Sequence, residues 1–316
     1  MRKGRKGGFK GDRETYGTLM AVIAAAISGG SIVANKAFVA GIDAALFTSV
    51  RSLVIGLAFL ALMFYSSGFS TAGLRKQFAA AKWRYLLPIA IVGGAAAFLL
   101  FFSGLQLTTA GRAAFIQKTL PIYVAVFAYW FLKEKITMKQ TYALIIMLLG
   151  AVLIFGSQID PARLWSDPLT GDLLIAGATV LWAVENTLSR KAMLGGESNL
   201  IVSFSRMFIG GLILFGVAGV AGNLGMLAAL TAYQWASIGA SAAMLFGYVF
   251  FWYYSISLIN VSKASAILLL APVVSLGLGV LVLGEPAPAV QLAGSALILA
   301  GAYVVSSIKS EMSTGV

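Results

Sequence analysis

Two charged residues, Lys118 and Glu185, stand inside long apolar stretches of the sequence. If these stretches cross a bilayer, each charge costs about 2.5–3.5 kcal/mol to place there, so both are predicted to act on a substrate or a proton. Glu185 is the acid placed deepest, which makes it the leading candidate to carry a coupling proton. Helix geometry separates the two by only about 8 Å in depth, so a salt bridge between them is the alternative.

The residues around Glu185 recur at helical spacing. Trp182, Glu185, Asn186 and Ser189 fall on one helix face, which should face the protein interior. The corresponding face in the first half of the chain carries Ile27, Gly30, Ser31 and Ala34. Three of these four residues are small, which lets helix backbones approach closely or leaves room for a ligand. We predict that Trp182, Glu185, Asn186 and Ser31 bind substrate together with Lys118.

Aromatic residues gather in two apolar stretches, 84–106 and 232–258. In the second stretch, Tyr248, Trp252 and Ser255 share a helix face. An aromatic wall suits an apolar, aromatic or cationic ligand, so Tyr248 and Trp252 are predicted to bind substrate. Packing within a bundle, or a belt at the membrane interface, is the alternative.

Two prolines, Pro121 and Pro272, interrupt apolar stretches. Proline frees the carbonyl four residues earlier, here that of Gln117 or Leu268, and bends the helix. A freed carbonyl in lipid needs a partner, so such breaks tend to line cavities. Kinks are predicted at both prolines, and Gln117 is predicted to contact substrate.

The composition is that of a membrane protein. Hydrophobic residues make up 59% of the chain, charged residues 11%, and the mean hydropathy is +0.91, whereas a soluble domain has roughly a quarter charged residues. The sequence holds no Cys and no His, so thiol chemistry and histidine proton shuttles are excluded. No nucleotide loop, dinucleotide fingerprint or metal cluster is present either, and no cofactor or metal is expected.

The apolar stretches predict an all-α protein of ten transmembrane helices. They run over residues 16–38, 43–66, 84–106, 109–132, 138–157, 172–193, 198–220, 232–258, 262–284 and 288–308. The predicted organisation is a basic tail (1–15), a first five-helix repeat (16–157), an extracytoplasmic linker (158–171), a second repeat (172–308) and a short tail (309–316).

The basic residues set the predicted orientation. Most of the 23 Lys and Arg residues fall in the N-terminal tail and in the loops on the same side of the membrane, whereas Arg163 is the clear exception. Such a bias places both termini in the cytoplasm. Because the basic residues are scattered over these loops, the net charge of +12 does not indicate nucleic-acid binding.

The two halves of the chain resemble each other. With an offset of 155, Lys36, Gly41, Arg51 and Gly56 fall on Lys191, Gly196, Arg206 and Gly211. With an offset of 151, Leu107, Arg112, Pro121, Glu134, Gln140 and Gly150 fall on Leu258, Lys263, Pro272, Glu285, Gln291 and Gly301. Five spans per repeat is an odd number, so the second copy must be inverted in the membrane, as in many secondary transporters.

Residues 107–151 and 258–302 carry a family resemblance. Each has a mid-helix proline, a short loop with an acid (Lys133-Glu134-Lys135 or Gly284-Glu285-Pro286), then a Gln and a glycine-containing helix. Both resemble the closing segment of an EamA domain, of the drug/metabolite transporter superfamily. The resemblance covers residues 16–308 and implies ten helices, cytoplasmic termini and export or exchange of small metabolites.

Four further charged residues are predicted to be structural. Arg51 and Arg206 are repeat-related and should reach headgroups or helix-end carbonyls. Glu134 and Glu285, which resemble the family's marker acid, should bind free N–H groups at the start of the next helix.

These observations predict a secondary active transporter in the cytoplasmic membrane, an exporter or exchanger of small organic metabolites that works by alternating access. Amino acids or related amines are favoured, because one acid, one base and aromatic walls suit a zwitterion. An anionic metabolite is the alternative, since Lys118, Arg51 and Arg206 outnumber Glu185. Further alternatives are an intramembrane enzyme and a membrane scaffold without transport activity. The expected partners are the substrate, the lipid bilayer and, through Glu185, a coupling proton.

Overall fold

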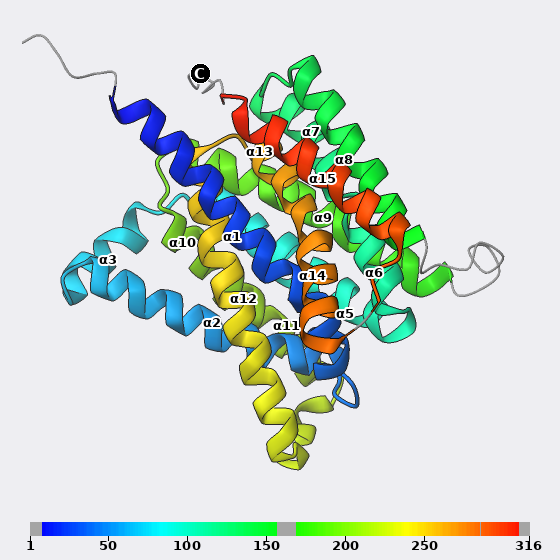
Figure 1. Ribbon diagram of the computed structural model, residues 1–316. Coiled ribbons are helices and arrows are strands. Elements are labelled where there is room, and N and C mark those ends of the chain that lie inside the picture. The colour runs from blue at the N-terminus through cyan, green and yellow to red at the C-terminus, as the bar shows by residue number, and fades with distance from the viewer. Residues whose placement is uncertain (1–7, 157–168, 285, 310–316) are drawn as a thin grey trace, which may run out of the picture.

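The computed structural model describes residues 8–156, 169–284 and 286–309 (Figure 1). Within these ranges the chain is helical and has no strand. Residues 1–7 of the predicted N-terminal tail, most of the predicted linker and of the C-terminal tail, and Glu285 lie outside the described residues, whereas residues 8–15 of the predicted tail are the start of α1.

The first half contains eight α-helices and two wider π-helical segments. They are α1 (Gly8–Phe38), α2 (Ala44–Ser66), α3 (Thr71–Ala80), α4 (Trp83–Pro88), η1 (Ile89–Ala96), α5 (Ala97–Leu107), α6 (Ala110–Gln117), α7 (Leu120–Phe127), η2 (Ala128–Leu132) and α8 (Met138–Gly156). Helix starts are fixed by side chains that accept from free N–H groups: Asp43 caps α2 and Thr109 caps α6.

The second half follows the same order. It comprises α9 (Leu169–Leu194), α10 (Asn199–Phe204), η4 (Ser205–Ile209), α11 (Gly210–Val220), η5 (Asn223–Ala229), α12 (Ala232–Leu258), α13 (Val261–Ile267), η6 (Leu268–Leu270), α14 (Ala271–Leu283) and α15 (Ala289–Ser307). Ser198 caps α10, and Thr231 with Gln234 forms a capping box at α12.

Eight helical stretches of the described residues are long and apolar enough to cross a membrane. They are Ala44–Ser66, Trp83–Leu107, Ala110–Leu132, Met138–Gly156, Asn199–Val220, Ala232–Leu258, Val261–Leu281 and Ala289–Ser307. Helices α1 and α9 are also of spanning length, with 31 and 26 residues, and they pack inside the same bundle. The chain is therefore a multi-span helical membrane protein.

The first helix of each half packs mainly against helices of the other half. Helix α1 packs on α12 and α14 of the second half, and α9 correspondingly packs on α5 and α7 of the first half. Two further contacts join helices at equivalent places in the two halves, α2 with α11 and α8 with α15. At the α8–α15 crossing, a Cβ on Gly150 would lie 2.5 Å from the Gly294 carbonyl oxygen, so glycine allows the two backbones to touch.

Several helices are interrupted near the middle of the bundle. Helices α6 and α7 are separated at Lys118 and Thr119, directly before Pro121, and a short 3-10 turn separates α13 from α14 directly before Pro272. The π-helical segment η1 begins just after Pro88, and η4 contains Arg206. These breaks place irregular backbone at the centre of the bundle. Its free N–H and C=O groups can be accommodated there if they line a cavity.

The bundle has two distinct ends. Helix α1 begins and α15 finishes at the same end, the upper one in Figure 1, which we call the terminal end. The second half of α1 and the start of α15 therefore lie toward the other end, which we call the distal end.

Candidate functional site

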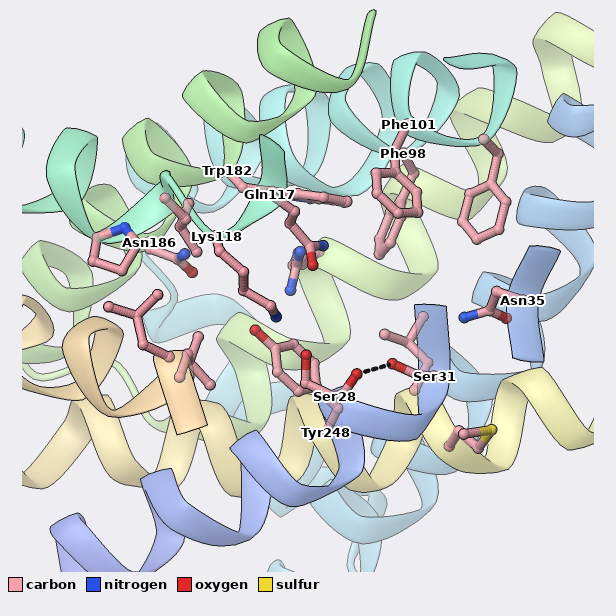
Figure 2. Close-up of a pocket in the computed structure, with 18 of the residues that line it drawn as sticks. Ser28, Ser31, Asn35, Phe98, Phe101, Gln117, Lys118, Trp182, Asn186 and Tyr248 are labelled. Carbon is pink, nitrogen blue, oxygen red and sulfur yellow. Dashed lines mark hydrogen bonds between the residues drawn. The ribbon is translucent and has the colours of Figure 1, made fainter. Parts of the chain in front are cut away.

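An inner cavity of about 90 Å³ lies between the two halves (Figure 2). Its polar wall residues are Ser28, Ser31, Asn35, Arg51, Gln117, Lys118, Asn186, Arg206 and Tyr248. Aromatic rings of Phe98, Phe101, Phe102 and Trp182 complete much of the wall. A cavity with apolar walls and a few converging polar groups is the usual form of a small-molecule site.

A larger vestibule of about 860 Å³ adjoins the inner cavity. The two share Ser28 and Lys118 in their walls. The vestibule is lined by the second half of α1, the starts of α6 and α15, the end of α8, and α14, so it lies toward the distal end. Since small-molecule pockets usually reach about 300 Å³, a ligand held in the inner cavity would extend into this vestibule.

Arg51 is almost completely buried, with 1% of its surface exposed. Its guanidinium lies 4.5 Å from the ring centre of Phe102 and donates to the Ser241 hydroxyl at 3.1 Å. Ser241 in turn donates to Asn35 Oδ1 at 2.5 Å. Nε and Nη2 of Arg51 make no hydrogen bond within the described part of the chain. These unused donors stand at a cavity wall, ready for an acceptor.

Arg206 and Arg51 contact the same aromatic ring, since both guanidinium carbons lie 5.1 Å from the ring centre of Phe98. Its Nε is 3.7 Å from Glu185 Oε2, an ion pair without a hydrogen bond. Neither arginine reaches headgroups or helix-end carbonyls, so that part of the sequence interpretation is wrong. Burial beside aromatic rings holds both at the cavity instead.

Glu185 lies behind the cavity wall and is fully buried. Its Oε1 accepts hydrogen bonds from the Tyr253 hydroxyl and from Ser189, the latter at 2.5 Å, while its Oε2 faces Arg206. The predicted salt bridge between Glu185 and Lys118 is not formed. The carboxylate is engaged by neighbours on α12, η4 and its own helix, and it stands as the counter-ion of Arg206.

Lys118 projects into the cavity from the break between α6 and α7, toward Tyr248 on the opposite wall (Figure 2). It is buried and, within the described residues, has no acidic partner. Arg51 likewise lacks one. With Glu185 compensating Arg206, three cations and one carboxylate leave a surplus of two positive charges at the cavity.

The aromatic side chains on α9 and α12 are held by hydrogen bonds. Trp182 Nε1 donates to the Gly93 carbonyl at 3.3 Å, which sets its ring against Phe101. Trp252 Nε1 donates to Asn186 Oδ1 at 2.9 Å. Trp252 does not itself line the cavity, contrary to its prediction as a substrate ligand, because its indole points at Asn186 from behind the wall.

The sequence analysis predicts several of the residues that line this cavity. Ser31, Gln117, Lys118, Trp182, Asn186 and Tyr248, all predicted as substrate ligands, line the inner cavity, as does Pro121. Pro272 lines the vestibule. The sequence reasoning missed Ser28 and Ser241; Ser28 lies three residues before Ser31, and that helical spacing could have found it.

Glu134 binds the opposite half of the chain at the terminal end. Its carboxylate accepts from the backbone N–H groups of Val261 and Ser262, at 3.0 and 3.1 Å, and from the Ser262 hydroxyl at 2.6 Å. We call these three bonds the Glu134 clasp. The prediction that Glu134 binds the next helix is wrong, since its partner is α13 in the second half. The loop carries Glu134 away from α8 and over the exposed N–H groups of α13.

Two ion pairs also cross between the halves, one at each end. Lys263 bonds Glu14 at 2.7 Å at the terminal end, and Arg112 pairs with Asp172 at the distal end. Arg112 and Lys263 are repeat-related, so the pairs have equivalent places. Because both pairs are present together, they do not decide which end is open.

Gly93 provides the space that Glu185 occupies. A Cβ at Gly93 would lie 2.0 Å from Glu185 Cγ. We expect Gly93→Ala to push the carboxylate away from Arg206 and to lower stability by about 1–3 kcal/mol, the usual cost of overpacking. Thermal unfolding of the purified protein measures this. Gly216→Ala is the control, because a Cβ there meets nothing within 4 Å; equal unfolding of both variants would refute the expectation.

The fold and the site define a class: a multi-span helical membrane protein with a polar, cationic cavity between its two halves. The chain matches the model of the EamA-like transporter family over residues 15–156 and 169–307, and it belongs to that family. The family recognised from the sequence is thereby confirmed.

Several relatives are similar over most of the chain. An uncharacterized transporter of Archaeoglobus fulgidus is 29% identical over 71% of this chain and 79% of its own length. The uncharacterized transporter YyaM of Bacillus subtilis is 28% identical over 79% and 80%. Mouse solute carrier family 35 member G1 matches 34% of this chain and 31% of its own length, at 29% identity.

A solved structure shares the fold. A crystal structure described only as that of a protein superposes with a TM-score of 0.72 and 17% sequence identity. The match covers 92% of this chain and 96% of the other.

Proposed function

We propose that this protein is a secondary transporter of small organic anions, which bind in the inner cavity between the two halves. The observation that carries the proposal is the surplus of two positive charges at a cavity whose remaining wall is apolar and includes several aromatic rings. Buried charges without partners are costly, and an anionic substrate would compensate them. The aromatic rings suit an apolar body on that anion.

The proposed architecture is ten transmembrane helices in two inverted five-helix repeats. The exchange of α1 and α9 between the halves supports it, as do the equivalent contacts of α2 with α11 and α8 with α15. The two separate family matches, one per half, agree with it. The basic loops favour cytoplasmic termini and a location in the cytoplasmic membrane, which makes the terminal end the cytoplasmic one.

The proposed mechanism is alternating access. The vestibule gives the inner cavity a route to the distal end, whereas the Glu134 clasp ties the halves together at the terminal end. This arrangement corresponds to an outward-facing state, and release of the clasp would open the inward-facing one. Outward transport remains the favoured direction because the family resemblance implies export.

Amines are a poor fit for this cavity. Glu185, the acid that would bind an ammonium group, is occupied by Arg206, Tyr253 and Ser189 behind the wall. The same engagement removes the reason for routing a coupling proton through it. A zwitterionic amino acid is the second candidate, since Ser28 and Ser31 on α1, opposite Lys118, offer oxygen atoms to an ammonium group (Figure 2). Membership of a transporter family favours transport over an enzyme or a scaffold.

Counterflow in proteoliposomes tests the proposal. The vesicles would be loaded with one unlabelled compound and exposed to its radiolabelled form, over a panel of carboxylates, phosphate esters, amino acids and amines. We expect counterflow of at least one anion. Uptake of amines without any anion would refute the anion class, and no counterflow across the panel would refute transport.

Lys118→Met removes one cation while keeping an unbranched side chain. Loss of a charge-assisted contact should weaken binding of the transported anion and raise its half-saturating concentration about tenfold or more. Lys133→Met is the control, because Lys133 lies in the loop after η2, outside both cavities. Unchanged transport in Lys118→Met would contradict a substrate-binding role for this lysine.

A further inference from the structure

Asn186 is held in one orientation by a partner that can only donate. The indole N–H of Trp252 has no lone pair with which to accept, so the amide must present Oδ1 to it. Trp252 lies behind the wall, whereas Asn186 lines the cavity. The amide NH₂ group is therefore turned toward the cavity.

Trp252 is itself fixed. Its side chain is fully buried, and its ring stacks almost parallel on Tyr248, with ring centres 6.2 Å apart and 5° between the planes. Tyr248 lines the cavity on its other side. The indole cannot turn away from Asn186 without displacing this second ring, so the amide orientation is built into the packing.

The NH₂ group of Asn186 belongs to a donor-rich part of the cavity. Figure 2 shows Asn186 and Lys118 on the same side of the cavity, from α9 and from the α6–α7 break. An ammonium group offers three donors and no acceptor. A substrate oxygen placed beside these two groups can accept from both, whereas neither the amide NH₂ nor the ammonium group can accept from a substrate N–H group.

We propose that Asn186 is a specificity-determining residue that donates to an acceptor oxygen of the substrate, and that Trp252 is the positioning residue that fixes its direction. The inference rests on the proposed transport of anions and deepens it. According to this inference, the protein prefers a carboxylate to the corresponding uncharged amide because the hydrogen bond from Trp252, behind the cavity wall, turns the NH₂ group of Asn186 toward the substrate.

Benzoate and benzamide are suitable probes because they share one shape and differ in charge and in one acceptor. Their dissociation constants would be measured by titration calorimetry on the full chain in lipid nanodiscs. We expect the wild type to prefer benzoate. Trp252→Phe keeps a ring but removes the N–H, so the amide can turn over, and the preference for benzoate should fall about tenfold, the value of one hydrogen bond to a charged group.

A matched control and a double variant separate positioning from general damage. Trp235→Phe makes the same change on the same helix at a half-exposed site and should leave both constants unchanged. Asn186→Ala should lower the preference, and adding Trp252→Phe should lower it no further, because the indole acts only through the amide. Should Trp252→Phe fail to fold, Asn186→Asp keeps an acceptor for the indole, replaces the donor, and should weaken benzoate binding at least tenfold.

Three results would overturn the inference. One is an unchanged preference in Trp252→Phe or in Asn186→Asp; another is an additive loss in the double variant. In either case the proposed function still stands if an anion shows counterflow. The third is a wild type that binds benzoate no more tightly than benzamide. If an anion nevertheless shows counterflow, the proposed transport of anions stands; if none does, that proposal is refuted as well.

Discussion

Glu185→Gln is expected to destabilise the protein by about 3–5 kcal/mol, the usual effect of removing one partner of a buried ion pair. Gln keeps an oxygen for the Tyr253 hydroxyl and for Ser189 but removes the negative charge beside Arg206. Arg206 would then be a buried cation with no acid near it. The measurement is the free energy of unfolding in a mixed-micelle titration.

A second substitution distinguishes charge from shape. Glu185→Gln combined with Arg206→Met removes both charges and should recover much of the lost stability, because a buried pair can be replaced by groups without charge. Glu197→Gln is the control, as Glu197 contacts the exposed backbone N–H of Lys82. Wild-type stability of Glu185→Gln would show that the ion pair does not hold the site.

The sequence predicted the wall of the cavity better than its charge pairs. Helical spacing alone places Trp182 and Asn186 on an inward face, and both line the cavity. Spacing gives the depth of a side chain and its direction from its own helix. It does not give the distance across the bundle. Depth alone therefore pairs Glu185 with Lys118, whereas the folded chain places Arg206 beside it.

Glu134 shows the same limit at the end of the bundle. The sequence indicates a carboxylate near free N–H groups, and the chain provides such groups nearby at the start of α8. The structure uses those of α13 instead, more than 120 positions away, as the bonds to Val261 and Ser262 show. Glu134 lies close to the start of α13 because helices are exchanged between the two halves. A pattern of neighbouring residues in the sequence cannot predict such a contact.

Removing the Glu134 clasp is expected to open the terminal end and close the distal one. Glu134→Ala loses three hydrogen bonds to a buried carboxylate, each worth about 1.5–3 kcal/mol, on one side of the membrane only. A shift of a few kcal/mol is enough to invert a two-state equilibrium. The chain has no cysteine, so a single introduced thiol reports accessibility without background.

Two reporter positions follow the two ends. Ser275→Cys lies in the vestibule and should react with a water-soluble maleimide in the parent protein, whereas Ser265→Cys, fully buried one turn beyond the clasp, should be protected. Glu134→Ala should slow the first reaction and speed the second, each by tenfold or more. Asp43→Ala removes a carboxylate that caps α2 within its own half, and it should change neither rate. If both thiols react in Glu134→Ala as they do in the parent, the clasp is a helix cap and does not control access, and the closed terminal end must depend on other contacts between the halves.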